Sequence, residues 1–307
     1  MNTSKSILEK VRLSIVEGEP FSFDIKRDDL IDPIISGNKW RKLQYNLLKA
    51  EALSKFGILT FGGPFSNHLI ATAKACSVAG LKSIAWVRGD ELRSESNDTL
   101  KACAEYGMEL VFISRSEYRK KDDVFFLKEL ASKYPDYYIV PEGGKSYYGV
   151  VGCQHILQET TNDYDHVYLA GGTGTTAAGV LLSASEKTKV HVVSALKGAF
   201  LQDDIQQLLR QVLNDEDSVA YYLKHLVMIN DGHFGGYARV NQELLDFINQ
   251  VYADLGLKLD PIYTGKAVFA MVKDYNEGLI GPEDKVLFIH TGGLQGATTW
   301  KDELNFL

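Results

Sequence analysis

Cysteine and histidine are scarce in this sequence, and neither forms a pattern that binds a metal. The 307 residues contain three cysteines and seven histidines. The cysteines are widely spaced and odd in number, and the histidines are scattered singly. A disulfide framework and a metal site are therefore not expected, and free thiols fit a reducing compartment, the cytoplasm.

Long apolar runs and blocks of like charge are also missing. No segment approaches the roughly 20 apolar residues that span a bilayer. The N-terminal stretch alternates charged and apolar side chains and lacks the apolar core of a secretion signal. The net charge of −7 is spread along the chain without a basic arm. Because clustered positive charge binds nucleic acid, neither a membrane nor a nucleic acid is an expected partner.

The chain alternates short β-rich runs with amphipathic helices, which is typical of an α/β fold with mainly parallel strands. Strands are predicted at 58–61, 83–87, 109–114, 137–140, 167–170, 190–195, 226–229 and 286–290. Helices are predicted near 40–56, 68–79, 97–106, 120–133, 150–160, 200–213, 241–255 and 266–276, with one more from 176.

The length of the chain favours two lobes over one compact domain. The rhythm of strands and helices restarts after the turn at 141–144. We predict a small α/β domain over 46–149 and a large domain made of 1–45 and 150–307. One continuous sheet is the alternative.

A Gly37-Asn38 turn opens a predicted helix whose first turn carries Lys39, with Lys42 on the same face. The partial positive charge of a helix N-terminus disfavours lysine there. The placement is explained if an anionic cofactor binds at this end of the helix. The alternative is that both lysines are ordinary solvated surface residues.

A second turn follows the strand that ends near Phe61. It runs Gly62-Gly63-Pro64-Phe65-Ser66-Asn67-His68 and opens another predicted helix. Ser66 or Asn67 is a natural N-cap, and the free N–H groups of the first helical turn suit a carboxylate. Simple helix capping is the alternative interpretation.

A third turn, Gly171-Gly172-Thr173-Gly174-Thr175-Thr176, joins a strand to a helix. Backbone N–H groups freed by glycine, with hydroxyls beside them, form a phosphate-binding loop. Gly172, Gly174 and Ala177 also match the dinucleotide fingerprint, but that fingerprint requires an acidic residue about 20 positions further on. The following strand ends without one, so a phosphate monoester is preferred and a nicotinamide-dependent oxidoreductase is the remote alternative.

A fourth pair of turns lies near the C-terminus. Tyr263 and Thr264 precede a predicted helix, and Thr291 ends a predicted strand. The two turns are expected to face the same cleft; a core tyrosine and two turn threonines are the alternative.

The five motifs together resemble one family. They read Gly-Asn-Lys-x-x-Lys-Leu, Gly-Gly-x-x-Ser-Asn-His, Gly-Gly-Thr-Gly-Thr-Thr, Asp-Pro-x-Tyr-Thr-Gly-Lys and His-Thr-Gly-Gly, in this order. The family is that of D-cysteine desulfhydrase and 1-aminocyclopropane-1-carboxylate deaminase, and the early Lys26-Arg27-Asp28-Asp29 also looks like a family motif. The resemblance implies pyridoxal 5'-phosphate as cofactor and the fold of tryptophan synthase β (fold type II). In that fold, two open, twisted, mainly parallel sheets enclose the cofactor between the lobes. A cytoplasmic homodimer is expected.

The resemblance also implies a role for each motif. Lys39 would carry the cofactor and act as base at Cα, with Ser66 and Tyr263 as further catalytic residues. Lys42, Asn67, Tyr237, Thr264, Thr291 and the loop Gly171, Gly172, Thr173, Gly174, Thr175, Thr176 would bind the cofactor. The substrate, a small amino acid, would contact Ser66, Asn67, His68, Tyr237 and Tyr263.

Two positions bear on the choice between the family's two activities. The deaminases carry glutamate at the position of Thr264 and leucine at that of Thr291, so this chain resembles the desulfhydrases. A neutral hydroxyl leaves the pyridine nitrogen largely unprotonated, which suits β-elimination of a good leaving group. The expected reaction converts D-cysteine to pyruvate, sulfide and ammonia, with 1-aminocyclopropane-1-carboxylate deaminase as the alternative. His68, where glutamine is frequent, and Ser36, which replaces a glycine, leave the substrate open.

Overall fold

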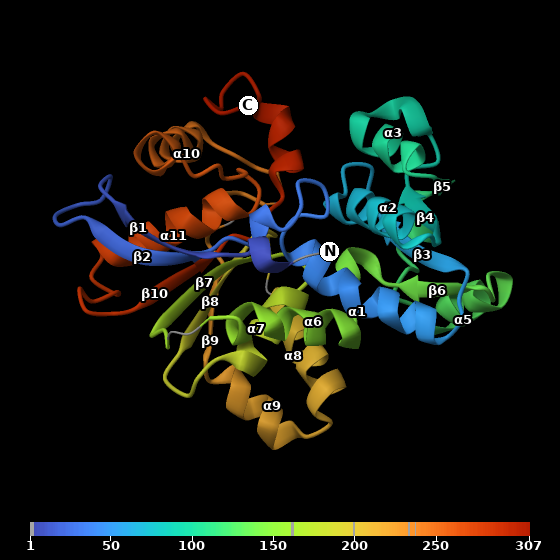
Figure 1. The fold of residues 1–307 in the computed structure, drawn as a ribbon, viewed down its shortest axis with the longest axis horizontal. Helices are drawn as coiled ribbons and strands as arrows, with labels where there is room; N and C mark the ends of the chain where they lie inside the picture. Colours follow the sequence, from blue (N-terminus) through green and yellow to red (C-terminus); the bar gives the residue numbers. More distant parts are fainter. Residues whose placement is uncertain (1–2, 161–162, 199, 233, 237) are drawn as a thin grey trace. The chain divides into compact units, whose positions relative to one another are not determined.

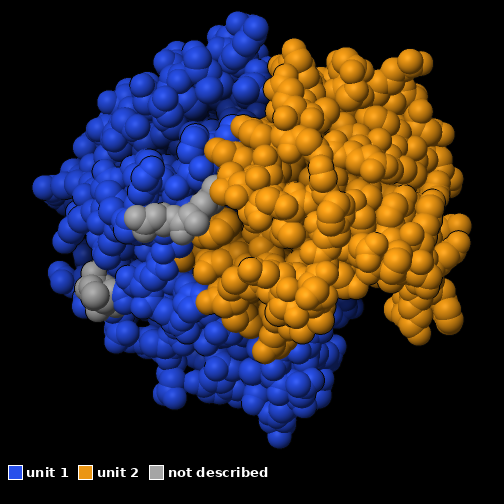
Figure 2. All heavy atoms as spheres, turned by 45° about the vertical axis from the view of Figure 1, so that its right-hand side comes forward, with its two compact units in different colours: residues 1–38, 153–307 blue, residues 39–152 orange. Residues whose placement is uncertain are grey.

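The computed structural model describes residues 3–160, 163–198, 200–232, 234–236 and 238–307. The chain forms a large unit of residues 1–38 and 153–307 and a small unit of residues 39–152 (Figure 2). The small unit begins before the predicted boundary at residue 46, because helix α1 (Asn38–Ala52) is one continuous element. Lys39 and Lys42 therefore belong to the small unit, whereas the sequence placed them in the large domain.

A four-stranded parallel sheet forms the centre of the small unit, in the order β5-β4-β3-β6. The strands are β3 (Gly57–Gly62), β4 (Lys82–Arg88), β5 (Met108–Ile113) and β6 (Tyr137–Val140). Its helices include α2 (Asn67–Ala79), α3 (Asp98–Glu105), α4 (Arg115–Tyr118) and α5 (Val124–Lys133), and α6 (Tyr147–Gln158) runs on into the large unit. Every residue of β3 is buried, which is typical of a parallel strand covered on both faces.

The helix predicted near 120–133 is shorter in the structure. Helix α4 ends at Tyr118 and α5 begins only at Val124. Asp123 caps α5, because its carboxylate accepts a hydrogen bond from the N–H of Phe126 at 2.9 Å. The prediction was wrong here because it missed this N-cap signal within a charged stretch.

A six-stranded sheet forms the centre of the large unit, in the order β1-β2-β10-β7-β8-β9 (Figure 1). The strands are β1 (Leu8–Leu13), β2 (Phe21–Lys26), β7 (His166–Gly171), β8 (Lys189–Ser194), β9 (Leu226–Ile229) and β10 (Val286–Ile289). The helices are α7 (Thr175–Ser183), α8 (Phe200–Leu213), α9 (Glu216–Leu223), α10 (Gln242–Leu255) and α11 (Thr264–Asn276). All strand pairs are parallel except β1 with β2.

The antiparallel hairpin of β1 and β2 and the helices α4 and α9 were not predicted from the sequence. Strand β1 is an edge strand with mostly exposed or half-buried residues, so it carries little apolar signal. Charged side chains on such an edge also discourage pairing with another chain. The fold class is confirmed: two mainly parallel sheets, each in its own α/β unit.

A buried pair of histidines joins two carboxylates within the large unit. His166 Nδ1 and His191 Nε2 are 2.9 Å apart, and His166 Nε2 lies 3.3 Å from Asp284. The ring of Tyr168 stacks on His191 with 4.1 Å between centroids, and its hydroxyl donates to Asp274 at 2.6 Å. Burial, the neighbouring His166 and Lys189 lower the pKa of His191 to about 3.

This lowered pKa predicts loss of stability in mild acid. A histidine in the unfolded chain takes up a proton near pH 6.5, whereas folded His191 resists it down to about pH 3. Its contribution is therefore complete above pH 6.5 and falls as the pH drops, by about 2 kcal/mol between pH 7.5 and pH 5. His191→Phe keeps a ring against Tyr168 but cannot titrate. Urea unfolding at the two pH values should show a smaller pH-dependent loss for this variant than for wild type; parallel losses would contradict the prediction.

Among the described residues, no helix is both long and apolar enough to cross a membrane. Nor does the described part of the chain gather three or more histidine, cysteine or acidic side chains in a metal-binding arrangement. The three described cysteines, Cys76, Cys103 and Cys153, are buried, and none of them forms a disulfide.

Candidate active site

The turn before Lys39 is anchored to two distant segments of the large unit. Asn38 donates its side-chain N–H to the Thr176 hydroxyl at 2.9 Å and its backbone N–H to the carbonyl of Thr291 at 3.2 Å. Gly37 has a left-handed φ of +59°, and a Cβ there would overlap the Thr291 carbonyl. Three motifs therefore meet at Asn38: the Gly37-Asn38 turn, the loop that contains Thr176, and the turn that contains Thr291. Lys39 is the next residue along the chain.

Lys42 lies in the small unit with its side chain buried to 5% exposure, whereas Lys39 is half-buried. The stem of Lys42 packs against Gly144, where an added Cβ would come within 3.0 Å of Lys42 Cβ. The Asn46 side chain donates to the Lys42 carbonyl at 2.6 Å. Lys42 is therefore an enclosed cation and not a solvated surface lysine.

The turn that ends at His68 follows β3 in the small unit. Ser66 is the N-cap residue of α2, yet its side chain makes no capping hydrogen bond. The Ser66 hydroxyl and the Asn67 amide are both half-buried and, among the described residues, have no hydrogen-bond partner. Simple capping therefore does not explain this motif. The first backbone N–H groups of the helix have no acceptor within the helix, so the turn offers donors to an anion.

His68 is almost fully enclosed within the small unit, at 3% exposure. Its Nε2 is 2.9 Å from the hydroxyl of Thr60, and that hydroxyl donates to the carbonyl of Val140 at 2.7 Å. Burial, followed by the charges of Lys42 and Lys39, lowers the pKa of His68 to about 3. The imidazole is therefore neutral at physiological pH.

The glycine-threonine loop links β7 to α7 in the large unit. Gly174 is the N-cap of α7 in the left-handed conformation, with φ 75°. Thr173 and Thr175 place their hydroxyls 3.2 Å apart. A Cβ at Gly172 would come within 3.4 Å of the Tyr263 ring, so this ring lies beside the loop. The loop leads into the N-terminus of α7 through Gly171, Gly172 and Gly174, and a helix N-terminus with threonine hydroxyls beside it is a suitable site for a phosphate.

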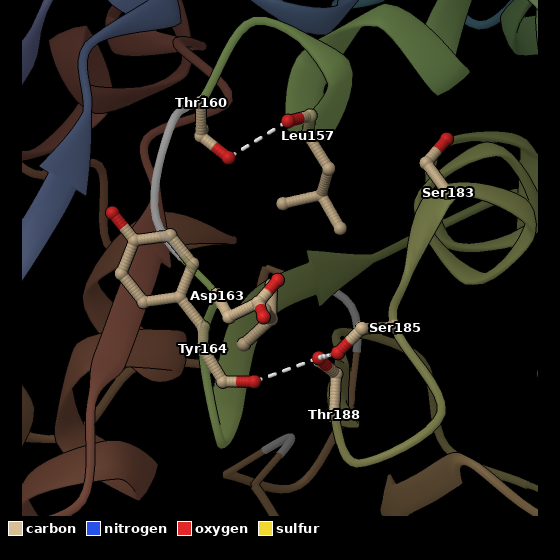
Figure 3. Close-up of a pocket in the computed structure, with 8 residues that line it drawn as sticks. Leu157, Thr160, Asp163, Tyr164, Ser183, Ser185 and Thr188 are labelled. Atoms are coloured by element: carbon tan, nitrogen blue, oxygen red, sulfur yellow. Dashed lines mark hydrogen bonds between the residues drawn. The ribbon is translucent and has the colours of Figure 1, made fainter.

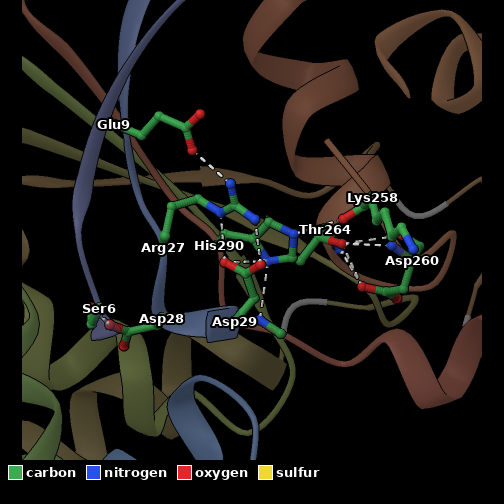
Figure 4. Close-up of polar contacts among 10 residues, drawn as sticks. Ser6, Glu9, Arg27, Asp28, Asp29, Lys258, Asp260, Thr264 and His290 are labelled. Carbon is green, nitrogen blue, oxygen red and sulfur yellow. Dashed lines mark hydrogen bonds and ion pairs between the residues drawn. The ribbon is translucent and has the colours of Figure 1, made fainter. Parts of the chain in front are cut away.

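Thr264 is buried and bonded within its own turn. Its hydroxyl donates to Asp260 Oδ2 at 2.6 Å and accepts from the Asp260 backbone N–H at 2.8 Å (Figure 4). The same carboxylate accepts from the N–H groups of Ile262 and Tyr263. The Thr264 hydroxyl therefore holds the turn that presents Tyr263.

An ion-pair network that contains Arg27 and Asp29 of the early Lys26–Asp29 motif reaches His290, the residue before Thr291 (Figure 4). Arg27 donates two hydrogen bonds to Asp29, at 2.9 and 2.8 Å, and one to Glu9 at 2.6 Å. The Asp29 N–H donates to the carbonyl of His290 at 3.1 Å, and His290 Nε2 donates to the carbonyl of Lys258 at 2.8 Å. This network joins the ends of β2 and β10 and so positions Thr291, whose hydroxyl has no hydrogen-bond partner among the described residues.

Lys266 and Thr60 have no role in the site predicted from the sequence. Lys266 is 1% exposed and donates to the carbonyl of Gly236 at 3.3 Å. Burial lowers its pKa to about 8, although Asp260 opposes the shift. The signal available in the sequence was the place of Lys266 in the Tyr-Thr-Gly-Lys motif, directly after Tyr263 and Thr264. Tyr237, a predicted contact of cofactor and substrate, lies outside the described residues.

A separate hollow of about 180 Å³ lies in the large unit (Figure 3). None of the predicted site residues lines it. Two of its hydroxyls are already bonded to backbone carbonyls, Thr160 to Leu157 and Thr188 to Tyr164, each at 2.7 Å. It is therefore not the candidate active site.

Comparison with known proteins gives matches that cover most of the chain. The sequence profile of a family described as pyridoxal-phosphate dependent enzyme matches residues 11–292. The Arabidopsis thaliana protein named bifunctional D-cysteine desulfhydrase/1-aminocyclopropane-1-carboxylate deaminase, mitochondrial, is 31% identical, over 91% of this chain and 74% of its own. A Klebsiella pneumoniae D-cysteine desulfhydrase is 25% identical, over 88% of this chain and 86% of its own. A crystal structure described as that of an ACC (1-aminocyclopropane-1-carboxylate) deaminase homologue superposes with a TM-score of 0.76 at 27% identity. The match covers 95% of this chain and 94% of that one.

Proposed function

We propose that this chain, which belongs to the family of pyridoxal-phosphate-dependent enzymes, is a lyase that converts D-cysteine and water to pyruvate, sulfide and ammonia. The observation that carries the proposal is the pair of hydrogen bonds from Asn38 to Thr176 and Thr291. These hydrogen bonds place the loop that is suited to a phosphate, through Thr176, and the residue with a neutral hydroxyl, Thr291, at Asn38, directly before Lys39.

The residues present fit the cofactor. Gly171 has no room for a Cβ, which would overlap Leu201, and Gly174 is left-handed. The loop between them can therefore present backbone N–H groups and threonine hydroxyls to a phosphate. The enclosed cation of Lys42 would supply further positive charge to a bound phosphate. When bound, the pyridoxal ring supplies an electron sink for the electrons of the broken Cα–H bond.

The protein's own groups then have separate tasks. Lys39 would hold the cofactor covalently and, once displaced by substrate, remove the proton from Cα. Asn67 would bind the ring oxygen, and the unpartnered Ser66 hydroxyl would hold the substrate carboxylate. The ring of Tyr263, beside Gly172, would cover one face of the cofactor.

The preference for elimination rests on Thr291 more than on Thr264. Thr291 would meet the pyridine nitrogen of the cofactor. Its hydroxyl carries no charge, so it would not hold a proton on that nitrogen, and a weaker electron sink suffices when thiolate leaves. The Thr264 hydroxyl is bonded to Asp260, so we assign it a positioning role and not a direct one. The deaminase activity in the Arabidopsis relative's name keeps 1-aminocyclopropane-1-carboxylate as the alternative substrate.

We also propose that the protein works as a homodimer in the cytoplasm. All three cysteines are buried and none forms a disulfide, which supports a reducing compartment. Twofold dimers are the commonest assemblies of soluble enzymes.

The reaction is tested by product release. The purified enzyme is expected to release pyruvate and sulfide from D-cysteine, and pyruvate from β-chloro-D-alanine, with little product from L-cysteine. 1-Aminocyclopropane-1-carboxylate, assayed alongside for 2-oxobutyrate, is expected to react poorly. Turnover of the cyclopropane substrate alone would overturn the argument from Thr291.

A further inference from the structure

The hydrogen bonds around His68 fix which of its ring nitrogens carries the hydrogen. The Thr60 hydroxyl has one hydrogen, and it donates that hydrogen to the Val140 carbonyl at 2.7 Å. The same oxygen can then only accept from His68 Nε2, which is 2.9 Å away. Nε2 therefore carries the ring hydrogen, and Nδ1 presents a lone pair.

That lone pair is enclosed and unused. His68 is 3% exposed, and in the described part of the chain no group donates a hydrogen bond to Nδ1. Buried polar atoms are normally paired, and an exception calls for a ligand or a catalytic role to explain it. Because burial, and then the charges of Lys42 and Lys39, lower the pKa of the ring to about 3, Nδ1 remains an acceptor and does not become a donor in mild acid.

We propose that His68 determines substrate specificity by accepting, at Nδ1, a hydrogen bond from an S–H or O–H group on the β-carbon of the substrate. This inference rests on the proposed function, because it assumes an amino acid joined to the cofactor through its amine. The turn at Ser66 and Asn67, directly before His68 in the chain, holds the substrate in that proposal.

The chemistry of a small amino acid leaves one partner for this nitrogen. The amine is used in the covalent link to the cofactor. The carboxylate has only acceptor oxygens, which a lone pair repels. A donor on the side chain remains, and the thiol of D-cysteine and the hydroxyl of D-serine both provide one. D-2-aminobutyrate and 1-aminocyclopropane-1-carboxylate do not.

The first test is binding to the holoenzyme. The dissociation constants of D-serine and D-2-aminobutyrate, taken from the initial change in cofactor absorbance, compare a β-hydroxyl with a methyl group of similar size. Wild type is expected to prefer D-serine by about 5- to 100-fold, the usual value of pairing a buried acceptor. His68→Phe should bind the two compounds about equally.

Two further variants separate hydrogen bonding from packing. His68→Gln offers an amide oxygen as acceptor, so it should retain part of the preference for D-serine. Thr60→Val keeps the imidazole but removes the group that fixes the tautomer, and should also lower the preference. Full preference in both His68→Phe and Thr60→Val would overturn the proposal.

The second test does not use turnover or variants. In protein labelled with ¹⁵N-histidine, without cofactor, His68 is expected to show the Nε2–H tautomer and no titration between about pH 5 and pH 8. With cofactor present, D-serine should shift the Nδ1 resonance and D-2-aminobutyrate should not. A hydrogen on Nδ1 would overturn the proposal.

These outcomes remain distinct from the failure of the proposed reaction. If D-cysteine releases no pyruvate but His68→Phe loses the preference for D-serine, the reaction is wrong and the role of His68 stands. If D-cysteine is turned over while the preference is absent in wild type, the role of His68 is wrong and the reaction stands.

Discussion

Replacing Lys39 by alanine is expected to lower the rate of pyruvate release from D-cysteine by about 100- to 10,000-fold, the usual contribution of a positioned general base. The variant should remain nearly inert when cofactor is added back, because the substrate then binds without a base at Cα. Lys39→Ala should also lose the near-violet absorbance of the lysine-bound cofactor.

A matched control is available on the same helix. Lys49 is half-buried near the end of α1, with its amine 5.7 Å from the ring centre of Tyr148. Lys49→Ala should retain near-normal activity and absorbance. Borohydride reduction and peptide mapping of wild type should place the pyridoxyl group on Lys39. A label on Lys42 or Lys266 would refute the assignment.

Gly174→Val is expected to weaken cofactor binding by about 10- to 100-fold. This factor corresponds to the usual strain energy of a residue that is forced into an unfavourable backbone conformation. The left-handed φ of +75° is unfavourable for valine, and its Cβ would lie 2.9 Å from Ile205 Cγ1. The loop must then shift, and the N–H groups at the start of α7 lose their orientation. Equilibrium dialysis of cofactor against the apoprotein measures the effect.

Two comparisons isolate the loop. Gly256 has a similar φ of +65° with nothing within 4 Å of an added Cβ, so Gly256→Val should lower thermal stability but leave cofactor affinity unchanged. Ser66→Ala should keep the cofactor and lose turnover. If Ser66→Ala instead loses the cofactor while Gly174→Val retains it, the roles of the two loops are reversed.

The two-sheet architecture could be predicted because its signals are local. Most central strands are short, fully buried apolar runs, as in β3 and β7, and glycines such as Gly80 end helices in the left-handed conformation. Strand β1 was missed because an exposed edge strand lacks this apolar signal. Strand β2 lies inside the sheet, and its alternation of buried Phe21, Phe23 and Ile25 with polar residues was a signal that the prediction overlooked. The helix predicted near 120–133 began too early because the marker of its true start at Val124 is a single capping aspartate, Asp123.

By itself, the sequence determined the chemical inventory of this protein: the glycine-threonine loop, the paired lysines, the Ser-Asn-His turn and the threonine after β10. Each is a run of neighbouring residues, and the residue types in the run indicate which chemical groups it can bind. Only the tertiary structure decided how these groups are used. Asn38 and Thr176 lie 138 residues apart yet share a hydrogen bond. The hydroxyl of Thr264 is bonded to Asp260, and the chain from Val140 through Thr60 assigns the hydrogen on His68. The physical reason is that a hydrogen-bond partner is set by proximity in space. The residue types and spacing within a single motif do not determine which distant residue will lie beside it.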